Sequence, residues 1–293
     1  MKKILRILFV GVLGAVFLQS CSALRNPLKI KNYVELETTE GSLVVGLYEG
    51  TPAHRDNFIG KCSSNFYDGT LMYSAVRNTE YSFGLRRGNR EKDLLSADLN
   101  GGRTLPSEFN EKILPLRYTI AMKSVDGAEN PEKSSDACLF FIIDGGKKLD
   151  IHEIRTTIAI KNRDTYKLYI EEYLSRPENA ALKDSMKALQ TMQTMKQYNE
   201  RYAELMNIVR PQIDKDGIEL FSISEKNIER YLKDGGVPMY EGRYTVFGEI
   251  SVGEDVVGRL SGIGTNLDGV PKKEVSIVST NVLKKKDFKK KYK

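Results

Sequence analysis

The sequence has little histidine, little cysteine and no tryptophan. Among its 293 residues there are two histidines, His54 and His152, and three cysteines. Few residues are therefore available for a histidine-based catalytic triad or a zinc site, and we expect no metal or cofactor. Beyond Cys21 only Cys62 and Cys138 remain. An oxidising compartment permits a bridge between them, but two small buried thiols are the favoured interpretation.

No charge of one sign dominates the body of the chain. Hydrophobic residues make up 40% and charged residues 29%, which excludes disorder, collagen and a polytopic membrane protein. The net charge of +6 comes from the ends, because residues 1–20 hold three basic residues and no acid, and residues 284–293 hold seven lysines and one aspartate. The body is therefore net acidic, and we expect no nucleic-acid partner. Residues 284–293 are predicted to be a solvated, lysine-rich tail.

The first segment has the features of an export signal. Three basic residues precede an apolar run over 7–18, which is too short to span a membrane. The following Leu18-Gln19-Ser20-Cys21 resembles a bacterial lipobox, in which the cysteine is diacylated and becomes the mature N-terminus. We therefore predict a lipoprotein signal over 1–20, lipidation at Cys21, a tether over 21–32, and a lipid anchor in the cell envelope, on the outer membrane facing the periplasm. An ordinary cleaved signal with an incidental cysteine is the alternative.

Short strand-like runs make up most of the body. Val34–Thr38 alternates apolar and polar residues, Glu40-Gly41 marks a turn, and Ser42–Tyr48 continues as the second strand of a hairpin. Thr51-Pro52 predicts the start of a helix. Further strand-like runs are Leu71–Val76, Tyr81–Leu85, Leu116–Met122, Cys138–Ile143, Tyr244–Ile250 and Val275–Leu283. Many short strands with few helices favour a mainly β fold, a closed antiparallel barrel.

Residues 151–236 interrupt this rhythm with a helical block that Pro177 divides. Six apolar residues recur at three- and four-residue steps, as along one helix face: Leu182, Met186, Leu189, Met192, Met195 and Tyr198. The stripe favours a packed core over a partner site, and a homodimer through 151–236 is a further hypothesis. A shorter helix is predicted over Ser224–Lys233, ending at Gly235-Gly236.

Several separated motifs, in order, resemble cyclophilin-type peptidyl-prolyl isomerases. They are Val34–Tyr48, Thr51–Phe58, Phe66–Thr70, Leu105–Phe109, Ser134–Ile142, Tyr244–Glu249 and Gly253–Val257. The resemblance covers about 33–150 and 237–283 and is nearest to bacterial lipoprotein cyclophilins of the Bacteroidetes type, which also carry a helical insertion ending in Gly-Gly. It implies an eight-stranded antiparallel barrel closed by two helices, here 52–64 and 254–261, with 151–236 inserted.

The resemblance also implies an activity, the isomerisation of X–Pro bonds in proline-containing peptides or unfolded envelope proteins. Rotation about this bond faces a barrier of about 18–20 kcal/mol. A catalyst holds the proline in an apolar pocket and directs a donor at the prolyl nitrogen as the bond twists. Cyclophilins use an arginine for this, beside a Phe/Met/Phe/Leu pocket and Gln, Asn, Trp and His residues.

The family's catalytic residues are poorly carried over. Its Phe-His-Arg-Val strand reads Met72-Tyr73-Ser74-Ala75, so Ser74 stands at the arginine position, and a hydroxyl cannot replace a cationic fork. When the family's next strand is matched to Phe83–Asn89, Arg86 stands at a glutamine position and is the candidate substitute donor. The alternative is that Arg86 is a solvated surface residue.

The other family positions fall on mixed residues. The resemblance assigns the proline pocket to Phe83, Phe141, Met239, Tyr240 and Tyr244, and the surrounding groove to Met72, Tyr73, Lys123, Ser124 and Leu139. Phe140 and Phe247 are predicted to be barrel core. Two functions follow. One is a weak or retuned isomerase and folding helper. The other is a non-catalytic peptide- or protein-binding lipoprotein that uses the degenerate groove or the helical insertion.

Overall fold

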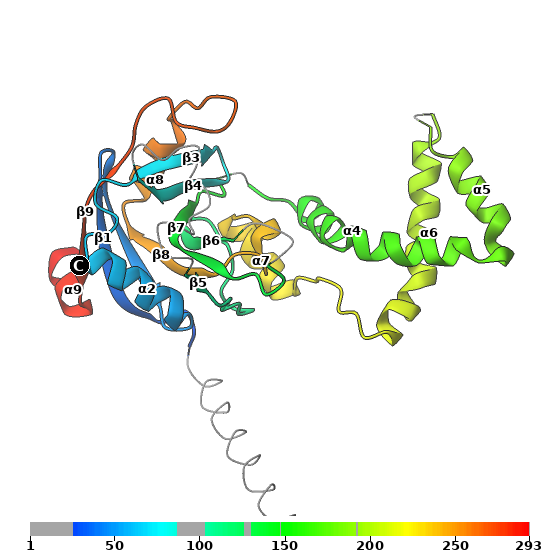
Figure 1. The fold of residues 1–293 in the computed structure, drawn as a ribbon, viewed down its shortest axis with the longest axis horizontal. Helices are drawn as coiled ribbons and strands as arrows, with labels where there is room; N and C mark the ends of the chain where they lie inside the picture. The colour runs from blue at the N-terminus through cyan, green and yellow to red at the C-terminus, as the bar shows by residue number, and fades with distance from the viewer. Residues whose placement is uncertain (1–25, 87–102, 126–129, 147, 192, 293) are drawn as a thin grey trace, which may run out of the picture. The chain divides into compact units, whose positions relative to one another are not determined.

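The computed structural model describes residues 26–86, 103–125, 130–146, 148–191 and 193–292 (Figure 1). The chain divides into two compact units. The sheet unit comprises residues up to Lys148 and from Arg230 onward, and the helical unit comprises Leu149–Glu229. The sequence places the insertion at 151–236, whereas the chain returns to the sheet unit earlier, inside helix α7 (Glu225–Asp234).

The sheet unit is built on one antiparallel sheet. Its strands are β1 (Ile30–Thr38), β2 (Gly41–Tyr48), β3 (Leu71–Val76), β4 (Glu80–Leu85), β5 (Thr104–Leu105), β6 (Thr119–Ser124), β7 (Ser135–Ile143), β8 (Val246–Val252) and β9 (Ile277–Leu283). Eight of them follow the order β3-β4-β7-β6-β8-β2-β1-β9, and β5 pairs with β7. The predicted hairpin is confirmed, because β1 and β2 pair from Tyr33↔Gly46 to Thr38↔Gly41.

The predicted closed barrel is wrong, because the sheet curls without closing. Its two ends, β3 and β9, share no strand ladder in the part of the chain that the structure describes. They meet at one isolated bridge, Leu71↔Ser276, beside a hydrogen bond from the Met72 N–H to the Val275 carbonyl of 2.9 Å. Pro271 instead forms an isolated bridge with Thr265, and regular strand pairing of this segment begins at Ile277.

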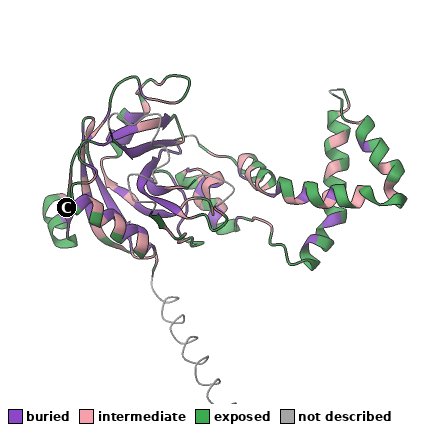
Figure 2. Cartoon of the chain, in the orientation of Figure 1, coloured by how far each residue is buried: buried purple, intermediate pink, exposed green. Residues whose placement is uncertain are grey.

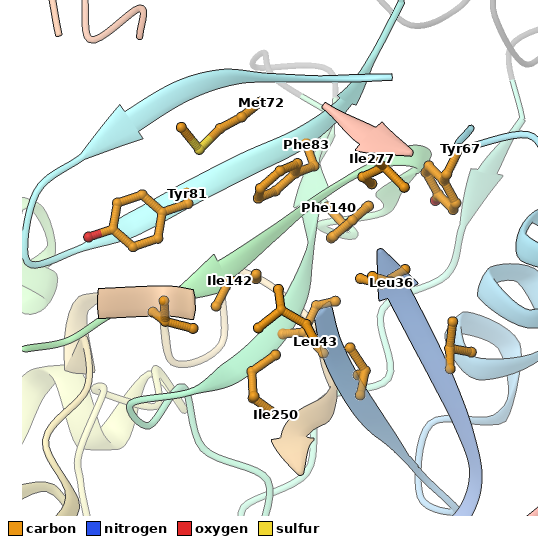
Figure 3. Close-up of a cluster of buried hydrophobic side chains, with 14 of the residues drawn as sticks. Leu36, Leu43, Tyr67, Met72, Tyr81, Phe83, Phe140, Ile142, Ile250 and Ile277 are labelled. Atoms are coloured by element: carbon orange, nitrogen blue, oxygen red, sulfur yellow. The ribbon is translucent and has the colours of Figure 1, made fainter. Parts of the chain in front are cut away.

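The inner face of the curled sheet holds the main core (Figure 3). Helix α2 (Pro52–Ser63) inserts Phe58, whose ring centroid lies 5.2 Å from those of both Phe140 and Phe247. Helix α8 (Glu254–Ser261) covers another part of this face with Val256, Val257 and Leu260. The prediction of Phe140 and Phe247 as core is confirmed, since both are fully buried.

The helical unit contains three long helices and a short turn. They are α4 (Ile151–Ser175), the 3-10 turn η1 (Pro177–Asn179), α5 (Ala180–Ala188) and α6 (Met195–Lys215). Its core joins residues of all three helices, among them Ile170, Met186 and Leu205, while most other positions are exposed (Figure 2). The predicted stripe does not lie on one helix, because α5 ends at Ala188 and α6 begins at Met195; Met192 lies outside the described residues.

The C-terminal lysine-rich segment is not the solvated tail that the sequence predicts. It forms helix α9 (Lys285–Tyr292), and the Phe288 ring stacks on Tyr33 of β1 with centroids 3.8 Å apart. Phe288 is buried, and the Lys291 ammonium pairs with Glu35 at 2.7 Å. One aromatic residue among the lysines therefore anchors the segment to the sheet unit.

Candidate active site

A row of paired residues crosses the outer face of the sheet. Ser74 of β3 pairs with Ser82 of β4, Ser82 with Phe141 of β7, and Phe141 with Ala121 of β6. Directly paired residues point to the same face, and Phe140 points into the core, so this row lies on the opposite face. The structure therefore brings two predicted site residues, Ser74 and Phe141, into one row, about 10 Å apart across two strand spacings.

Three aromatic rings meet on this row. Phe141 contacts Tyr240 and Tyr244 edge to face, with ring centroids 5.7 Å and 5.1 Å away, and the two tyrosines lie 4.9 Å from each other. Tyr240 ends the 3-10 turn η2 (Pro238–Tyr240), and its carbonyl accepts the Tyr244 N–H at 3.2 Å. This turn therefore holds both tyrosines against β7. Three of the five predicted pocket residues form one outer-face aromatic cluster, which is Phe141, Tyr240 and Tyr244.

A lysine lies against this cluster. The Lys123 ammonium is 4.5 Å from the Phe141 ring centroid and 5.7 Å from that of Tyr244, within the range of cation–π attraction. The same ammonium pairs with the carboxylate of Glu80, whose side chain is 7% exposed. The aromatic surface is thus shared with an ion pair of the chain itself.

The ion pair also changes the chemistry of Tyr240. Burial raises the pKa of the Tyr240 hydroxyl, and the nearby Glu80 carboxylate raises it further, because a phenolate would repel it. Tyr240 is therefore a neutral hydrogen-bond donor at physiological pH. Ser82 completes the polar edge, since its hydroxyl donates to Glu80 at 3.3 Å.

Two predicted site residues lie in the core instead. Phe83 is 1% exposed, pairs with Phe140, and stacks on that ring with centroids 5.6 Å apart. Met72 pairs with Phe83 and is buried in the same cluster. The assignment of Phe83 to the pocket wall and of Met72 to the groove is therefore corrected. Side chains alternate along β4, so Phe83 shares the inner face with Tyr81, while Ser82 lies on the outer face.

Arg86 does not join the aromatic cluster. It follows β4, is exposed, and its guanidinium carbon lies 5.2 Å from the Phe66 ring centroid. Within the part of the chain that the structure describes, it makes no cation–π contact with Phe141, Tyr240 or Tyr244. The structure thus favours the alternative that the sequence left open, a surface arginine.

The other predicted groove residues surround the row with mixed roles. Leu139 alternates with Phe141 along β7 and is buried. Tyr73 occupies the irregularity between the Met72 and Ser74 pairs and is half-buried. The Ser124 hydroxyl accepts from the Asn130 side chain at 3.1 Å, and Met239 is half-buried within η2.

The sequence reasoning missed Glu80 and Ser82. The signal was available, because in Glu80-Tyr81-Ser82-Phe83 a strand alternation that buries Tyr81 and Phe83 places the other two on the outer face. Lys123 was named as a groove residue, but its pairing with Glu80 depends on strands that are distant in sequence.

A second polar cluster ties α2 to the sheet. The Glu108 carboxylate accepts the backbone N–H groups of Ala53 and His54, each at 3.0 Å, and lies 2.7 Å from His54 Nδ1. On the other side, His54 Nε2 lies 3.0 Å from the Ser135 hydroxyl oxygen. These contacts lower the pKa of Glu108 despite its burial. His54 and Ser135 are almost fully buried, so the Ser–His–Glu series is a structural brace without substrate access.

The described residues include no group that could hold a metal ion and no helix long and apolar enough to cross a membrane. Cys62 and Cys138 are both free and buried. Burial raises the pKa of the Cys62 thiol to about 12. Cys21, the predicted lipidation site, lies outside the described residues.

Two crystal structures of a cyclophilin-type peptidyl-prolyl cis-trans isomerase from Cryptosporidium parvum resemble the chain at 13% identity. One covers 87% of this chain and 98% of its own, with a TM-score of 0.47. The other, obtained with the dipeptide Ala-Pro, covers 86% and 98%, with a TM-score of 0.46.

The sequence comparison covers much of the sheet unit. Residues 33–156 match the model of the family described as cyclophilin type peptidyl-prolyl cis-trans isomerase/CLD, and this range contains Ser74, Lys123 and Phe141. The second stretch of the expected resemblance, 237–283, lies outside the match. By this match, residues 33–156 are similar to the cyclophilin-type peptidyl-prolyl cis-trans isomerases, and the match covers less than half of the chain.

Proposed function

We propose that this chain is a cyclophilin-type peptidyl-prolyl isomerase of the cell envelope, a folding helper of weak or retuned activity. The observation that carries the proposal is the aromatic cluster in which the rings of Tyr240 and Tyr244 lie at the edges of Phe141, the residue that the resemblance assigns to the proline pocket. A prolyl ring is apolar, and its burial against aromatic surface favours binding. The substrate is an exposed X–Pro segment of an unfolded envelope protein.

The weakness has two physical sources. Ser74 at the arginine position has no charge to direct at the prolyl nitrogen, so less of the amide resonance is offset as the bond twists. Phe141 is fully buried under Tyr240, Tyr244 and the Lys123 ammonium, so these groups must move away before a prolyl ring reaches it. Displacing an ammonium from an aromatic face costs about 1 kcal/mol, about a fivefold loss of affinity.

A protease-coupled assay with a prolyl peptide tests the activity. We expect a rate above buffer at micromolar protein and a loss of that rate in Phe141→Ala. Val76→Ala, at an exposed position of strand β3, two strands away from β7, is the control and keeps the rate. A wild-type rate equal to the uncatalysed rate in buffer would contradict the proposed isomerase activity.

A double variant tests the role of the ion pair. Glu80→Gln with Lys123→Ala removes both charges together, so no carboxylate is left unpaired, and we expect activity to rise about fivefold. Arg86→Ala leaves kcat/KM unchanged, because Arg86 lies at Phe66. A fall in activity in the double variant contradicts the blocking role and makes Lys123 a substitute donor.

The second candidate is a non-catalytic peptide-binding lipoprotein. The Lys123–Glu80 pair against the aromatic cluster favours it, because a site that binds charged or polar segments has use for both groups. Calorimetric titration with the peptide of the assay separates the two: binding without any rate above buffer establishes the second candidate.

The envelope location rests on the pattern of residues 1–21. We propose that Cys21 is lipidated and holds the chain on the outer membrane, facing the periplasm. Membrane fractionation of the wild type and of Cys21→Ser tests this, and equal partition of both removes the anchor. The homodimer through 151–236 stays a proposal that sedimentation of Cys21→Ser decides, with a monomer ending it.

A further inference from the structure

The helical unit contains a groove with an apolar floor. The groove has a volume of about 540 Å³, within the range of small-molecule sites, and lies between α4, α5 and α6. Ile170, Leu174 and Met186 line it, together with Tyr198 and Tyr202. We call it the basic groove because of its rim.

The rim carries four cations against one carboxylate. Arg163 and Lys167 stand one turn apart on α4, and Lys183 and Lys187 stand one turn apart on α5, so each helix directs two cations to the groove. The carboxylate is Glu171, which lies 3.9 Å from Lys167. In the part of the chain that the structure describes, no ion pair involves Lys183 or Lys187.

The cavity of the sheet unit provides a contrast. It has a volume of about 630 Å³ and is lined by Arg117 and Arg230 but also by the carboxylates of Asp234, Glu249 and Glu254. Glu249 accepts a hydrogen bond of 2.8 Å from the Tyr48 hydroxyl. The lining of that cavity carries both signs of charge, whereas the lining of the basic groove is mostly cationic.

We propose that the basic groove binds a single-chain amphiphile with an anionic head, such as a free fatty acid or a lysophospholipid. An acyl chain has no polar groups and loses nothing on an apolar floor, while the head meets Lys183 and Lys187 at the rim. An extended peptide fits less well, because its backbone N–H and C=O groups would face Ile170, Leu174 and Met186 without partners. The inference does not depend on the isomerase.

Binding is measured at the groove itself. The chain has no tryptophan, so Asn199→Trp, at an exposed lining position, gives a single fluorescent reporter in the full chain. Titration with laurate below its micellar concentration is expected to shift the emission. Dodecanol, which lacks the charge, binds about tenfold more weakly, and shorter carboxylates lose about fourfold for each methylene removed.

Charge and floor are then changed separately in the reporter background. Lys183→Glu with Lys187→Glu weakens laurate about tenfold and leaves dodecanol unchanged. Leu174→Gln weakens both ligands. Lys289→Glu with Lys290→Glu makes the same change of net charge on α9, in the sheet unit, and leaves both unchanged. Helical circular dichroism confirms that each variant is folded.

The outcomes distinguish the sources of the ligand. Tighter binding of laurate than of lysophosphatidylglycerol assigns a free carboxylate, and the reverse order assigns a phosphate head; both support the proposal. Equal binding of laurate and dodecanol, or unchanged laurate binding in the Lys183/Lys187 variant, overturns it. A glutamate-rich amphipathic peptide that binds where laurate does not also overturns it and makes the groove a protein-docking site.

Discussion

Phe140 and Phe141 are neighbours in β7, and their side chains enter two different environments. Phe140 contacts Phe58, Tyr67 and Phe83 within a closed apolar core. Phe141 contacts two tyrosines and lies under the Lys123 ammonium. The inner face is determined by packing alone, while the outer face combines aromatic surface with charge. The difference shows that adjacent residues of one strand can belong to two separate buried clusters, one on each face of the sheet.

The largest effect is expected on the inner face. Phe140→Ala leaves a cavity among three aromatic neighbours that cannot collapse independently, so we expect a loss of about 3–5 kcal/mol in the free energy of unfolding. Val278→Ala in β9, where the side chain is 54% exposed, changes stability by less than about 0.5 kcal/mol. Urea denaturation followed by circular dichroism measures both. Comparable losses would mean that the core is not centred on Phe140.

The next largest loss of stability is expected when the Lys123–Glu80 ion pair of the outer face is broken. Lys123→Met leaves the Glu80 carboxylate, 7% exposed, without its partner, and we expect a loss of about 2–3 kcal/mol. Glu80→Gln is expected to cost only about 1 kcal/mol, because the Lys123 side chain is 20% exposed and reaches water. The same denaturation experiment measures the asymmetry. Equal losses, or the reverse order, would show that Glu80 is better solvated than its burial implies.

The brace of α2 gives a smaller, pH-dependent effect. The pKa of Glu108 is lowered in the folded chain, so its carboxylate stabilises the fold above its ordinary pKa of about 4.3, and this stability is lost as the pH falls through the folded value. Glu108→Gln is expected to cost about 1 kcal/mol at pH 7, since the helix N–H groups lose a charged acceptor. The difference in the free energy of unfolding between this variant and the wild type becomes smaller below about pH 4. A gap that is constant from pH 7 to pH 3 would remove the carboxylate's role.

Sequence reasoning succeeded where the signal is local. The hairpin at Glu40-Gly41 and the helix after Thr51-Pro52 depend on a few adjacent residues, and both were located to within a residue or two. The outer-face cluster of Phe141, Tyr240 and Tyr244 was also named in advance, through the family's motifs.

The failures share a dependence on distant partners. The inward direction of Phe83 depends on the irregularity at Tyr73 and on the pairing of β4 with β7, and neither can be read from the sequence of β4 alone. The stripe through Met192 continues the helical period across a break in the helix, which periodicity cannot reveal. The terminal helix is held by the contact of Phe288 with Tyr33, two residues that lie far apart in the sequence.

The last prediction is that the two buried cysteines of the folded chain do not react with an alkylating reagent. It tests how completely the inner face of the sheet is closed to solvent. Cys62 is buried in the main core, where burial raises the pKa of its thiol to about 12. Cys138 on β7 is also fully buried. A thiol reacts as the thiolate, so at pH 8 neither residue is expected to be alkylated by iodoacetamide in the folded chain. In Cys21→Ser, which retains only these two thiols, mass spectrometry should find no adduct before unfolding in urea and two after it. Rapid modification of either cysteine in the native protein would show that the core opens to solvent. The environments of Phe140 and Phe141 would then differ less than their burial implies.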